Sequence, residues 1–367
     1  MTNSVHVSVE ELYDVAYTIL TSFGIDDDLA KRAANTLNVA DARGVDSHGV
    51  ARLTFYDRCI RKGEIKAKPN IKVIKETPVS AYFDCDYGIG IATADIVMDK
   101  AIELAKRSGI GIATGMNGHH FGVAGHYALK AAEQGLIGFA CAPSLLLVAP
   151  TGGKEKMLGN SPNSIAFPKG HTTPSMMMDM ASTMVAGGKI QMAMRKGEQV
   201  PFGWILDADG NDTQDPMTFE DKNTGKILGS LVPMAGPKGY CIIVMIELIS
   251  SILSGAKTGP NLIGGGAGLG YFMLAIDPQI IRPLDEFKTD LDDYYHMIKN
   301  SPKKEGVYEI YLPGEIEHEN TQKRMQEGID LNGVVAQDLL NLMIEYNQLP
   351  KDAQLKDLFK KAYSVNL

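Results

Sequence analysis

Residues 110–144 alternate between apolar runs and a helical pattern, and this alternation constrains the fold more than any other feature of the chain. The runs 110-IGIATGM-116 and 136-LIGFACAPS-144 have the composition of buried strands, and 122-GVAGHYALKAAEQG-135 predicts a helix between them. Strand–helix–strand alternation is typical of α/β proteins. The connecting turn, 117-NGHHFGVAGH-126, holds three of the eight histidines, and such a turn places side chains at the edge of a sheet.

The two ends of the chain have a different character, which is mostly helical. Ser8 and Glu11 have the spacing of a capping box, and apolar periodicity predicts helices at about 27–42 and 47–61. From about residue 284 the pattern is again helical, with one short strand expected near 309–312.

This distribution predicts a division into two domains. Residues 1–75 together with 285–367 are expected to form a helical domain built from both chain ends. Residues 76–284 are expected to form an α/β domain around a central mixed sheet.

The composition excludes several classes of protein. The formal net charge is −8, and no basic cluster is longer than two residues, so a nucleic acid is not an expected partner. The four cysteines form no CxxC pair, and the N-terminus does not have the pattern of a signal peptide. The apolar stretch 240–256 contains Glu247 and is short for a membrane span. We expect a cytoplasmic protein that does not associate with a membrane.

Familiar ligand-binding motifs are absent from the sequence. Glycine-rich stretches do not complete G-x-G-x-x-G, because the sixth positions are Thr93, Thr114 and Leu269. Neither a P-loop nor HExxH occurs. Adjacent residues of an extended turn point to opposite faces, so His119 and His120 are not expected to bind one metal ion together, and no metal site is predicted.

Two patterns indicate a site for a small anion and for proton transfer. If Ser47 caps the helix at 47–61, His48 and Arg52 share one face and could hold a carboxylate, with the guanidinium bidentate. A histidine in the turn after a buried strand suits acid–base chemistry, because its ordinary pKa lies near neutrality. Each pattern also has a purely structural interpretation. His48 and Arg52 could be solvated or paired inside the protein, and the histidine of the turn could have only a structural role.

Two further stretches could receive a phosphate group. The stretch 178-MDMASTMVAGGKI-190 places Asp179 in an apolar strand before a glycine-rich helix start. Lys238 lies between Gly-Pro and Gly at the start of an apolar helix that covers about 239–255. Simple helix capping and a solvated lysine are the alternatives.

Together, these stretches resemble one family in order and spacing, the type 2 malate/L-lactate dehydrogenases. This family also contains sulfolactate and ureidoglycolate dehydrogenases, diketogulonate reductases and cyclic-imine reductases. The family pattern RGxDSHGxxR matches residues 43–52, and N-x-x-HFGxAG matches residues 117–125. Further matches, which extend the resemblance over nearly the whole chain, lie at residues 149–168, 178–189, 201–216, 236–256 and 313–315.

The resemblance implies an NAD(P)-binding fold that is not a Rossmann domain. It implies hydride transfer between the nicotinamide of NAD or NADP and C2 of a small 2-hydroxy or 2-oxo acid, either malate/oxaloacetate or lactate/pyruvate. The alternatives are a reductase of another 2-oxo acid or cyclic imino acid of the family (sulfolactate, ureidoglycolate, diketogulonate or piperideine-carboxylate type) and a catalytically silent binding protein. Retention of His48, Arg52, His120 and Lys238 argues against the silent protein.

The resemblance also assigns residues to roles. Acid–base catalysis falls to His120, and binding of the substrate carboxylate falls to Ser47, His48 and Arg52. A homodimer is implied. His119 and His126 differ from the residues common at these positions in the family, and packing is the favoured role for both, with tuning of substrate choice as the alternative. Cofactor binding is assigned to Ser144, Asp179, Met180, Ala181, Lys238, Pro313, Gly314 and Glu315.

Overall fold

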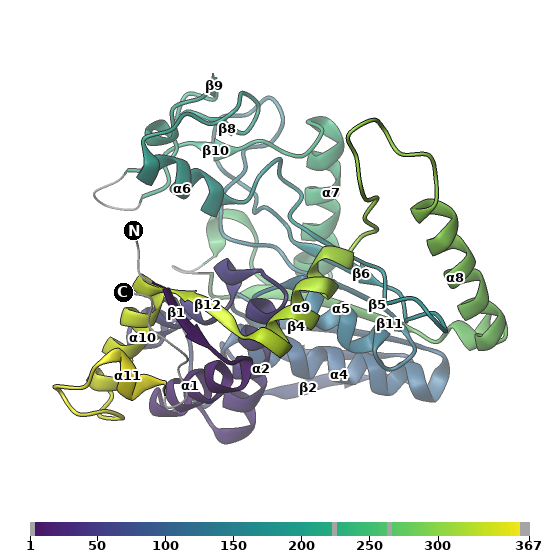
Figure 1. Ribbon diagram of the computed structural model, residues 1–367, viewed down its shortest axis with the longest axis horizontal. Helices are drawn as coiled ribbons and strands as arrows, with labels where there is room; N and C mark the ends of the chain where they lie inside the picture. Colours follow the sequence, from purple (N-terminus) through teal and green to yellow (C-terminus); the bar gives the residue numbers. More distant parts are fainter. Residues whose placement is uncertain (1–3, 222–225, 263–265, 360–367) are drawn as a thin grey trace.

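A seven-stranded sheet with the order β2-β3-β4-β11-β5-β6-β7 forms the centre of the protein (Figure 1). The computed structural model describes residues 4–221, 226–262 and 266–359. Strands β3 and β4 are parallel and the other neighbouring pairs are antiparallel, which confirms the predicted α/β class with a mixed sheet. The strands are β2 (Lys72–Glu76), β3 (Ser80–Asp84), β4 (Ile110–Gly118), β5 (Ile137–Cys141), β6 (Asn163–Ala166), β7 (Met177–Met180) and β11 (Leu269–Ile276).

Two helices cover the sheet and carry the predicted alternation. Helix α4 (Gly90–Ser108) joins the parallel strands β3 and β4, as a parallel crossover requires, and it ends at Gly109 with φ +82°. Helix α5 (Ala124–Ala132) follows β4 and leads into β5. Buried side chains of α4, α5 and the central strands form one apolar core, so the alternation predicted for residues 110–144 is confirmed.

The two chain ends lie side by side and share a second core (Figure 1). Strand β1 (Ser4–Val7) pairs antiparallel with β12 (Ile329–Asn332), and the shared core extends from residue 5 to 92 and from 329 to 359. This core contains residues up to position 92, beyond the predicted end of the helical domain at residue 75. The exact domain boundaries therefore stay a prediction. The helices at this end are α1 (Val9–Ser22), α2 (Asp27–Ala42), α3 (Leu53–Arg61), α10 (Gly333–Glu345) and α11 (Leu355–Leu358).

A small lobe with its own apolar core stands above the large sheet in Figure 1. We define the small lobe as residues 185–221 and 226–243. Its three short strands have the order β10-β8-β9, so the part of the chain predicted as one sheet domain contains two sheets. The lobe comprises α6 (Gly187–Lys196), β8 (Ile205–Leu206), β9 (Asp212–Thr213), β10 (Ser230–Leu231) and most of α7 (Pro237–Glu247), which a π-helical turn, Leu248–Ile252, extends.

One local prediction is right only from residue 53 onward, and another is wrong. The helix predicted at 47–61 is two 3-10 turns, Asp46–His48 and Val50–Arg52, followed by α3. The Asp41 carboxylate accepts a hydrogen bond from Val50 N (2.8 Å) and lies where a Cβ on Gly49 would be, so a regular helix cannot pass this point. Residues 309–312 are not a strand, because Leu312 N donates to the Glu315 carboxylate (2.9 Å) instead of to a neighbouring strand.

The remaining helices are α8 (Leu284–Lys299) and α9 (Glu315–Glu327). Tyr295 of α8 donates a hydrogen bond to Glu315 at the start of α9 (2.5 Å), which ties the two helices together. Within the described residues, no helix combines the length and the apolar character that a membrane crossing needs.

Candidate active site

His48 and His120, 72 residues apart in the sequence, stack on each other with their ring centroids 5.7 Å apart. The hydroxyl of Tyr56 is hydrogen-bonded to Nδ1 of His120 at 2.8 Å. Phe55 packs edge-on against the same ring, with a centroid distance of 5.6 Å. The two motifs that the sequence analysis selected therefore meet in one place, and His120 keeps Nε2 for a further partner.

The turn that carries His120 is held by Tyr271 of β11. The Tyr271 hydroxyl donates to the carbonyl of His119 and accepts from its amide, both at 2.7 Å. Gly90 packs so closely that a Cβ there would lie 2.2 Å from the His120 carbonyl. Gly122, with φ +76°, then turns the chain into α5. The backbone around His120 is thus fixed from three sides.

The 3-10 turns that carry Ser47, His48 and Arg52 are held by bonds within the loop and from α9. The Ser47 hydroxyl is bonded to Nδ1 of His48 (3.0 Å), and Nε of Arg52 donates to the Ser47 carbonyl (2.6 Å). Arg324 of α9 donates to the Asp41 carbonyl and to the Asp46 carboxylate, each at 2.5 Å. His48 and Arg52 are brought together by these bonds and not by the helical spacing that the sequence suggested.

The pKa values of this cluster are set first by burial. Burial, with Arg52 nearby, lowers the pKa of His48 to about 4. Burial is the largest cause that lowers the pKa of His120 well below its ordinary value, and the nearby cationic forms of His48, Arg52 and His119 lower it further. Both histidine rings nevertheless keep some solvent access. The two rings are therefore largely surrounded by protein but not sealed from solvent. Because their pKa values are lowered, both are neutral at pH 7.

A second group of predicted residues meets at the edge strand β7. The Asp179 carboxylate accepts a hydrogen bond from Gly125 N (2.9 Å), at the start of α5. Desolvation by the surrounding protein raises the pKa of the Asp179 carboxyl to about 6, against the lowering effects of the Gly125 amide and Arg43, although the residue as a whole remains exposed. The Pro313 carbonyl accepts from Met177 N (2.9 Å), and a Cβ on Gly314 would lie 2.9 Å from the Met177 carbonyl. Residues 177–181, 313–314 and the turn after His120 are consequently neighbours.

The malate/L-lactate dehydrogenase family model matches residues 7–340 of the sequence. This chain belongs to the malate/L-lactate dehydrogenase family. The malate dehydrogenase of Pyrococcus abyssi is 37% identical over 348 residues, covering 92% of this chain and 94% of that protein. The L-sulfolactate dehydrogenase of Methanocaldococcus jannaschii is 37% identical over 319 residues, covering 86% of this chain and 89% of that protein.

Solved structures of the malate/L-lactate dehydrogenase family share the fold. The malate dehydrogenase of Entamoeba histolytica matches with a TM-score of 0.88 at 32% identity, over 95% of this chain and 100% of that chain. The sulfolactate dehydrogenase of Methanocaldococcus jannaschii matches with a TM-score of 0.85 at 34% identity, over 96% and 99%. The predicted family fold is confirmed, and the chain is a dehydrogenase of the 2-hydroxyacid type.

The other residues that the resemblance assigned to the cofactor lie in different surroundings. The Ser144 hydroxyl accepts from Asn160 N (2.9 Å), and Lys238 is an exposed residue in the first turn of α7. The Glu315 carboxylate is buried and is bonded to Lys299, Tyr295 and Leu312 N, so its oxygens are used inside the protein. Among the described residues, neither Lys238 nor Ser144 makes a hydrogen bond, ion pair or ring contact with the histidine pair.

Tyr56 and Asp41 belong to the site, although neither was predicted from the sequence. Tyr56 lies four residues after Arg52, and the helical spacing predicted at 47–61 would have placed it on the face that carries His48 and Arg52. Asp41 had no comparable signal, because its partner is a backbone amide in the next turn.

His126, whose role the sequence left open, is part of a buried ion network. Its Nε2 lies 3.1 Å from Asp95, which also pairs with Arg32 and Lys130. His126 thus joins α5 to α4 and does not contact His120.

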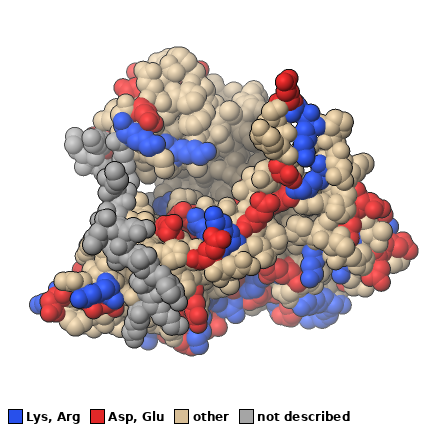
Figure 2. All heavy atoms as spheres, viewed as in Figure 1, with Lys and Arg blue, Asp and Glu red and all other residues tan. Residues whose placement is uncertain are grey.

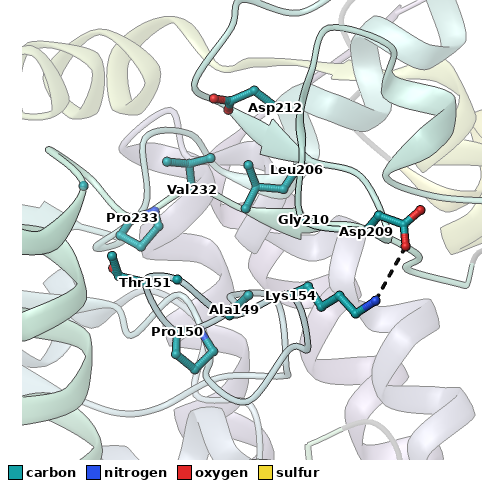
Figure 3. Close-up of a pocket in the computed structure, with 13 residues that line it drawn as sticks. Ala149, Pro150, Thr151, Lys154, Leu206, Asp209, Gly210, Asp212, Val232 and Pro233 are labelled. Carbon is teal, nitrogen blue, oxygen red and sulfur yellow. Dashed lines mark ion pairs between the residues drawn. The ribbon is translucent and has the colours of Figure 1, made fainter.

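The face seen in Figure 2 is hollowed between the small lobe, at the top of the view, and the layer below it. Next to the small lobe lies a cavity of about 450 Å³, lined by residues 149–154 and by parts of β8, β9 and the segment before α7 (Figure 3). An ion pair between Lys154 and Asp209 (3.7 Å) lies at its rim. The lining contains none of the residues assigned to the site from the sequence.

Proposed function

We propose that the protein is an NAD(P)-dependent oxidoreductase that interconverts a small 2-hydroxy acid and its 2-oxo acid. Malate with oxaloacetate, or lactate with pyruvate, is the favoured pair, and another 2-oxo acid or a cyclic imino acid is the alternative. The observation that carries the proposal is the pairing of His120 with Tyr56 beside His48 and the Arg52 guanidinium. A proton carrier and an anion-binding group are the two functions that the reaction needs from the protein.

His120 acts as the acid–base group through Nε2. When Nδ1–H donates to the Tyr56 oxygen, Nε2 presents a lone pair that takes the hydroxyl proton of the 2-hydroxy acid. In the reverse direction, protonated His120 donates from Nε2 to the carbonyl oxygen and returns to the neutral form. Because its pKa is lowered in the free protein, His120 is ready as a base at neutral pH. A bound carboxylate beside Arg52 would offset the positive charge and raise the pKa of His120 again.

Arg52, His48 and Ser47 hold the substrate carboxylate. Arg52 supplies the charge, since His48 with a pKa of about 4 is neutral. If the Ser47 hydroxyl donates to Nδ1 of His48, then Nε2–H of His48 is a neutral donor for one carboxylate oxygen. One charged and one neutral donor suit a small carboxylate better than a large polyanion.

The residues around α6 fit a phosphate-bearing cofactor. The ten-residue helix α6 begins without a side-chain cap, and a Cβ on Gly187 or Gly188 would meet no atom within 4 Å, so its first amides are open to an anion. Bound NAD or NADP would supply or accept the hydride. We propose that this helix start, Lys238, Ser144 and the neighbouring segments Asp179–Met180–Ala181 and Pro313–Gly314 hold it, and that Glu315 positions the last of these.

A panel assay tests the proposal. Purified protein is mixed with NADH or NADPH and with oxaloacetate, pyruvate, sulfopyruvate or a cyclic imino acid, and the loss of reduced cofactor is followed. Turnover with one 2-oxo acid, abolished in His120→Gln, is the expected result. Absence of turnover with every combination would overturn the proposal, and turnover only with the imino acid would select the alternative.

We also propose a homodimer. The outer side of α7 and the π-helical turn exposes Met245, Leu248, Ile252 and Leu253, with exposed fractions between 45% and 64%. We call these four residues the apolar stripe. A contiguous exposed apolar surface of this kind marks a protein contact more often than a free surface.

A further inference from the structure

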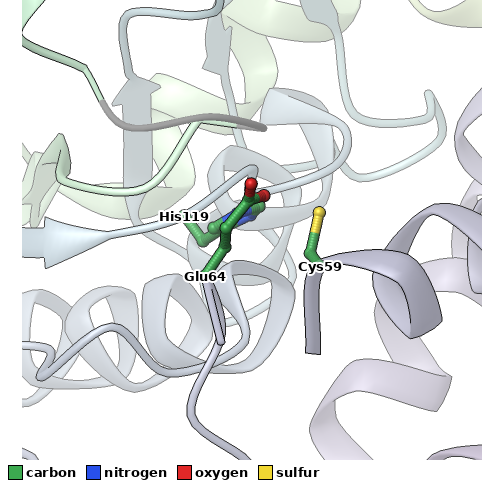
Figure 4. A group of neighbouring side chains, drawn as sticks. All are labelled: Cys59, Glu64 and His119. Atoms are coloured by element: carbon green, nitrogen blue, oxygen red, sulfur yellow. The ribbon is translucent and has the colours of Figure 1, made fainter. Parts of the chain in front are cut away.

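Three side chains that could bind a metal ion meet beneath the active site. Cys59 is in the last turns of α3, Glu64 is in the turn that follows, and His119 comes after the end of β4. One potential ligand atom from each lies within 4.8 Å of the other two. Figure 4 shows that the three side chains come from separate segments of the backbone and converge.

His119 has no polar contact of its own in this place. The ring is fully buried, and neither Nδ1 nor Nε2 has a hydrogen-bond partner among the residues that the structure describes. The ring of Phe55 packs against it at a tilt, with a centroid distance of 5.9 Å. An unpartnered buried imidazole costs stability, so a histidine in such a position needs a ligand to explain it.

We propose that Cys59, Glu64 and His119 form a zinc site. A thiolate sulfur, an imidazole nitrogen and a carboxylate oxygen form a mixed set that zinc accepts, whereas calcium and magnesium prefer oxygen ligands alone. The charges of a thiolate and a carboxylate balance a divalent cation, which a buried site requires. Three protein ligands leave the fourth tetrahedral position for a water molecule.

The proposed zinc site also gives the adjacent residues His119 and His120 different roles. A metal ion shared by His119 and His120 is not expected from the sequence. Nδ1 of His120 is bonded to Tyr56, whereas neither ring nitrogen of His119 has a hydrogen-bond partner among the described residues. The proposed site uses His119 alone, together with two residues that lie 55 and more positions earlier in the chain. Zinc would join the end of α3, the helix that carries Tyr56, to the residue before His120. Its role is to position the catalytic group, since none of its ligands contacts His120 Nε2 in the described structure.

Metal content tests the site without reference to turnover. The full-length protein is purified, equilibrated with zinc chloride, desalted and analysed by mass spectrometry for metal. The wild type should retain about one zinc per chain, and Cys59→Ala and His119→Asn should each retain at least about tenfold less. Cys241→Ala is the matched control, because Cys241 is an exposed free cysteine, and it should bind zinc as the wild type does.

Cobalt and thermal melting separate a lost site from a lost fold. Co²⁺ added to metal-free wild type should give the absorption of a thiolate-bound tetrahedral ion, and Glu64→Gln should weaken it. Zinc should raise the melting temperature of the wild type and of Cys241→Ala, but not that of folded Cys59→Ala. Wild-type protein that retains no zinc and gives no cobalt–thiolate absorption overturns the proposal, as does unchanged zinc content in the Cys59 and His119 variants.

Discussion

The hydrogen bond between Tyr56 and His120 decides which nitrogen of the histidine meets the substrate, and it leads to the first prediction. His120→Gln removes the acid–base group, so kcat should fall by about 100-fold or more while the cofactor still binds. Stopped-flow kinetics and the fluorescence of bound NADH measure the two quantities. Tyr56→Phe is the comparison, because it keeps the base and removes only its partner. It should lower kcat less and shift the pH profile. Wild-type kcat in His120→Gln would refute the role.

Arg52 is predicted to act mainly in binding. Arg52→Ala removes a charged donor for the carboxylate, which is worth about 1.5–3 kcal/mol, so KM should rise by roughly 10-fold to 100-fold. Steady-state kinetics with the preferred 2-oxo acid give KM and kcat separately. The control is Arg107→Ala, an exposed arginine at the end of α4 that pairs with Glu76 and should leave KM unchanged. An equal rise in both variants would show a general effect of charge and not a carboxylate clamp.

At this scale, the sequence reveals residues whose chemistry is local to a motif and misses those that act through tertiary contacts. His48, Arg52 and His120 were identified from their motifs, and the structure brings them together. The buried ion network around His126 depends on Asp95 of another helix, and nothing in the turn itself indicates that partner.

The elements follow the sequence where their own periodicity is strong. The bounds of α2 and the capping box of α1 are as predicted, since apolar spacing and an N-cap are local signals. Strands β1 and β12 are four residues long, and their paired residues, from Ser4 with Asn332 to Val7 with Ile329, are 328 to 322 positions apart, so no local pattern distinguishes them from helix ends. The break at Gly49 was missed because Asp41, which causes it, belongs to the preceding helix.

Asp41, at the end of α2, should make the stability of the protein depend on pH through its contact with the loop before α3. Asp41 is 2% exposed, and burial raises its pKa to about 8, whereas an unfolded aspartate has a pKa of about 3.9. The folded protein therefore binds the proton more tightly, and this contribution, complete below about pH 4, is lost as the pH rises through 8. Asp41→Asn removes the titration.

Urea unfolding at pH 5, 7 and 9 checks this prediction. The unfolding free energy of the wild type should fall relative to that of Asp41→Asn, by at least about 1 kcal/mol between pH 5 and 9. Val50→Ala is a useful control, because it disturbs the same loop and keeps the carboxyl group. Parallel pH curves for wild type and Asp41→Asn would show that Asp41 titrates normally.

At the scale of the whole molecule, the arrangement arises from contacts between distant segments. The shared core of the chain ends was expected from their helical character, but the separate core of the small lobe was not. Its strands are two residues long, too short for any alternation of apolar and polar residues to show. The sequence motifs match residues of the small lobe to the family pattern, but they do not predict that these residues form a separate lobe.

The apolar stripe on α7 leads to the last prediction, which concerns assembly. If it forms the homodimer interface, a charge introduced within it must be buried without a partner, which association cannot tolerate. Leu253→Glu, at a position 64% exposed in the single chain, should therefore convert the dimer to a monomer. Light scattering after size-exclusion chromatography gives the mass. Ile281→Glu introduces the same charge at an apolar residue that is 79% exposed and lies outside the stripe, and this variant should remain a dimer. Dimeric Leu253→Glu would place the interface elsewhere, and a monomeric wild type would exclude the homodimer.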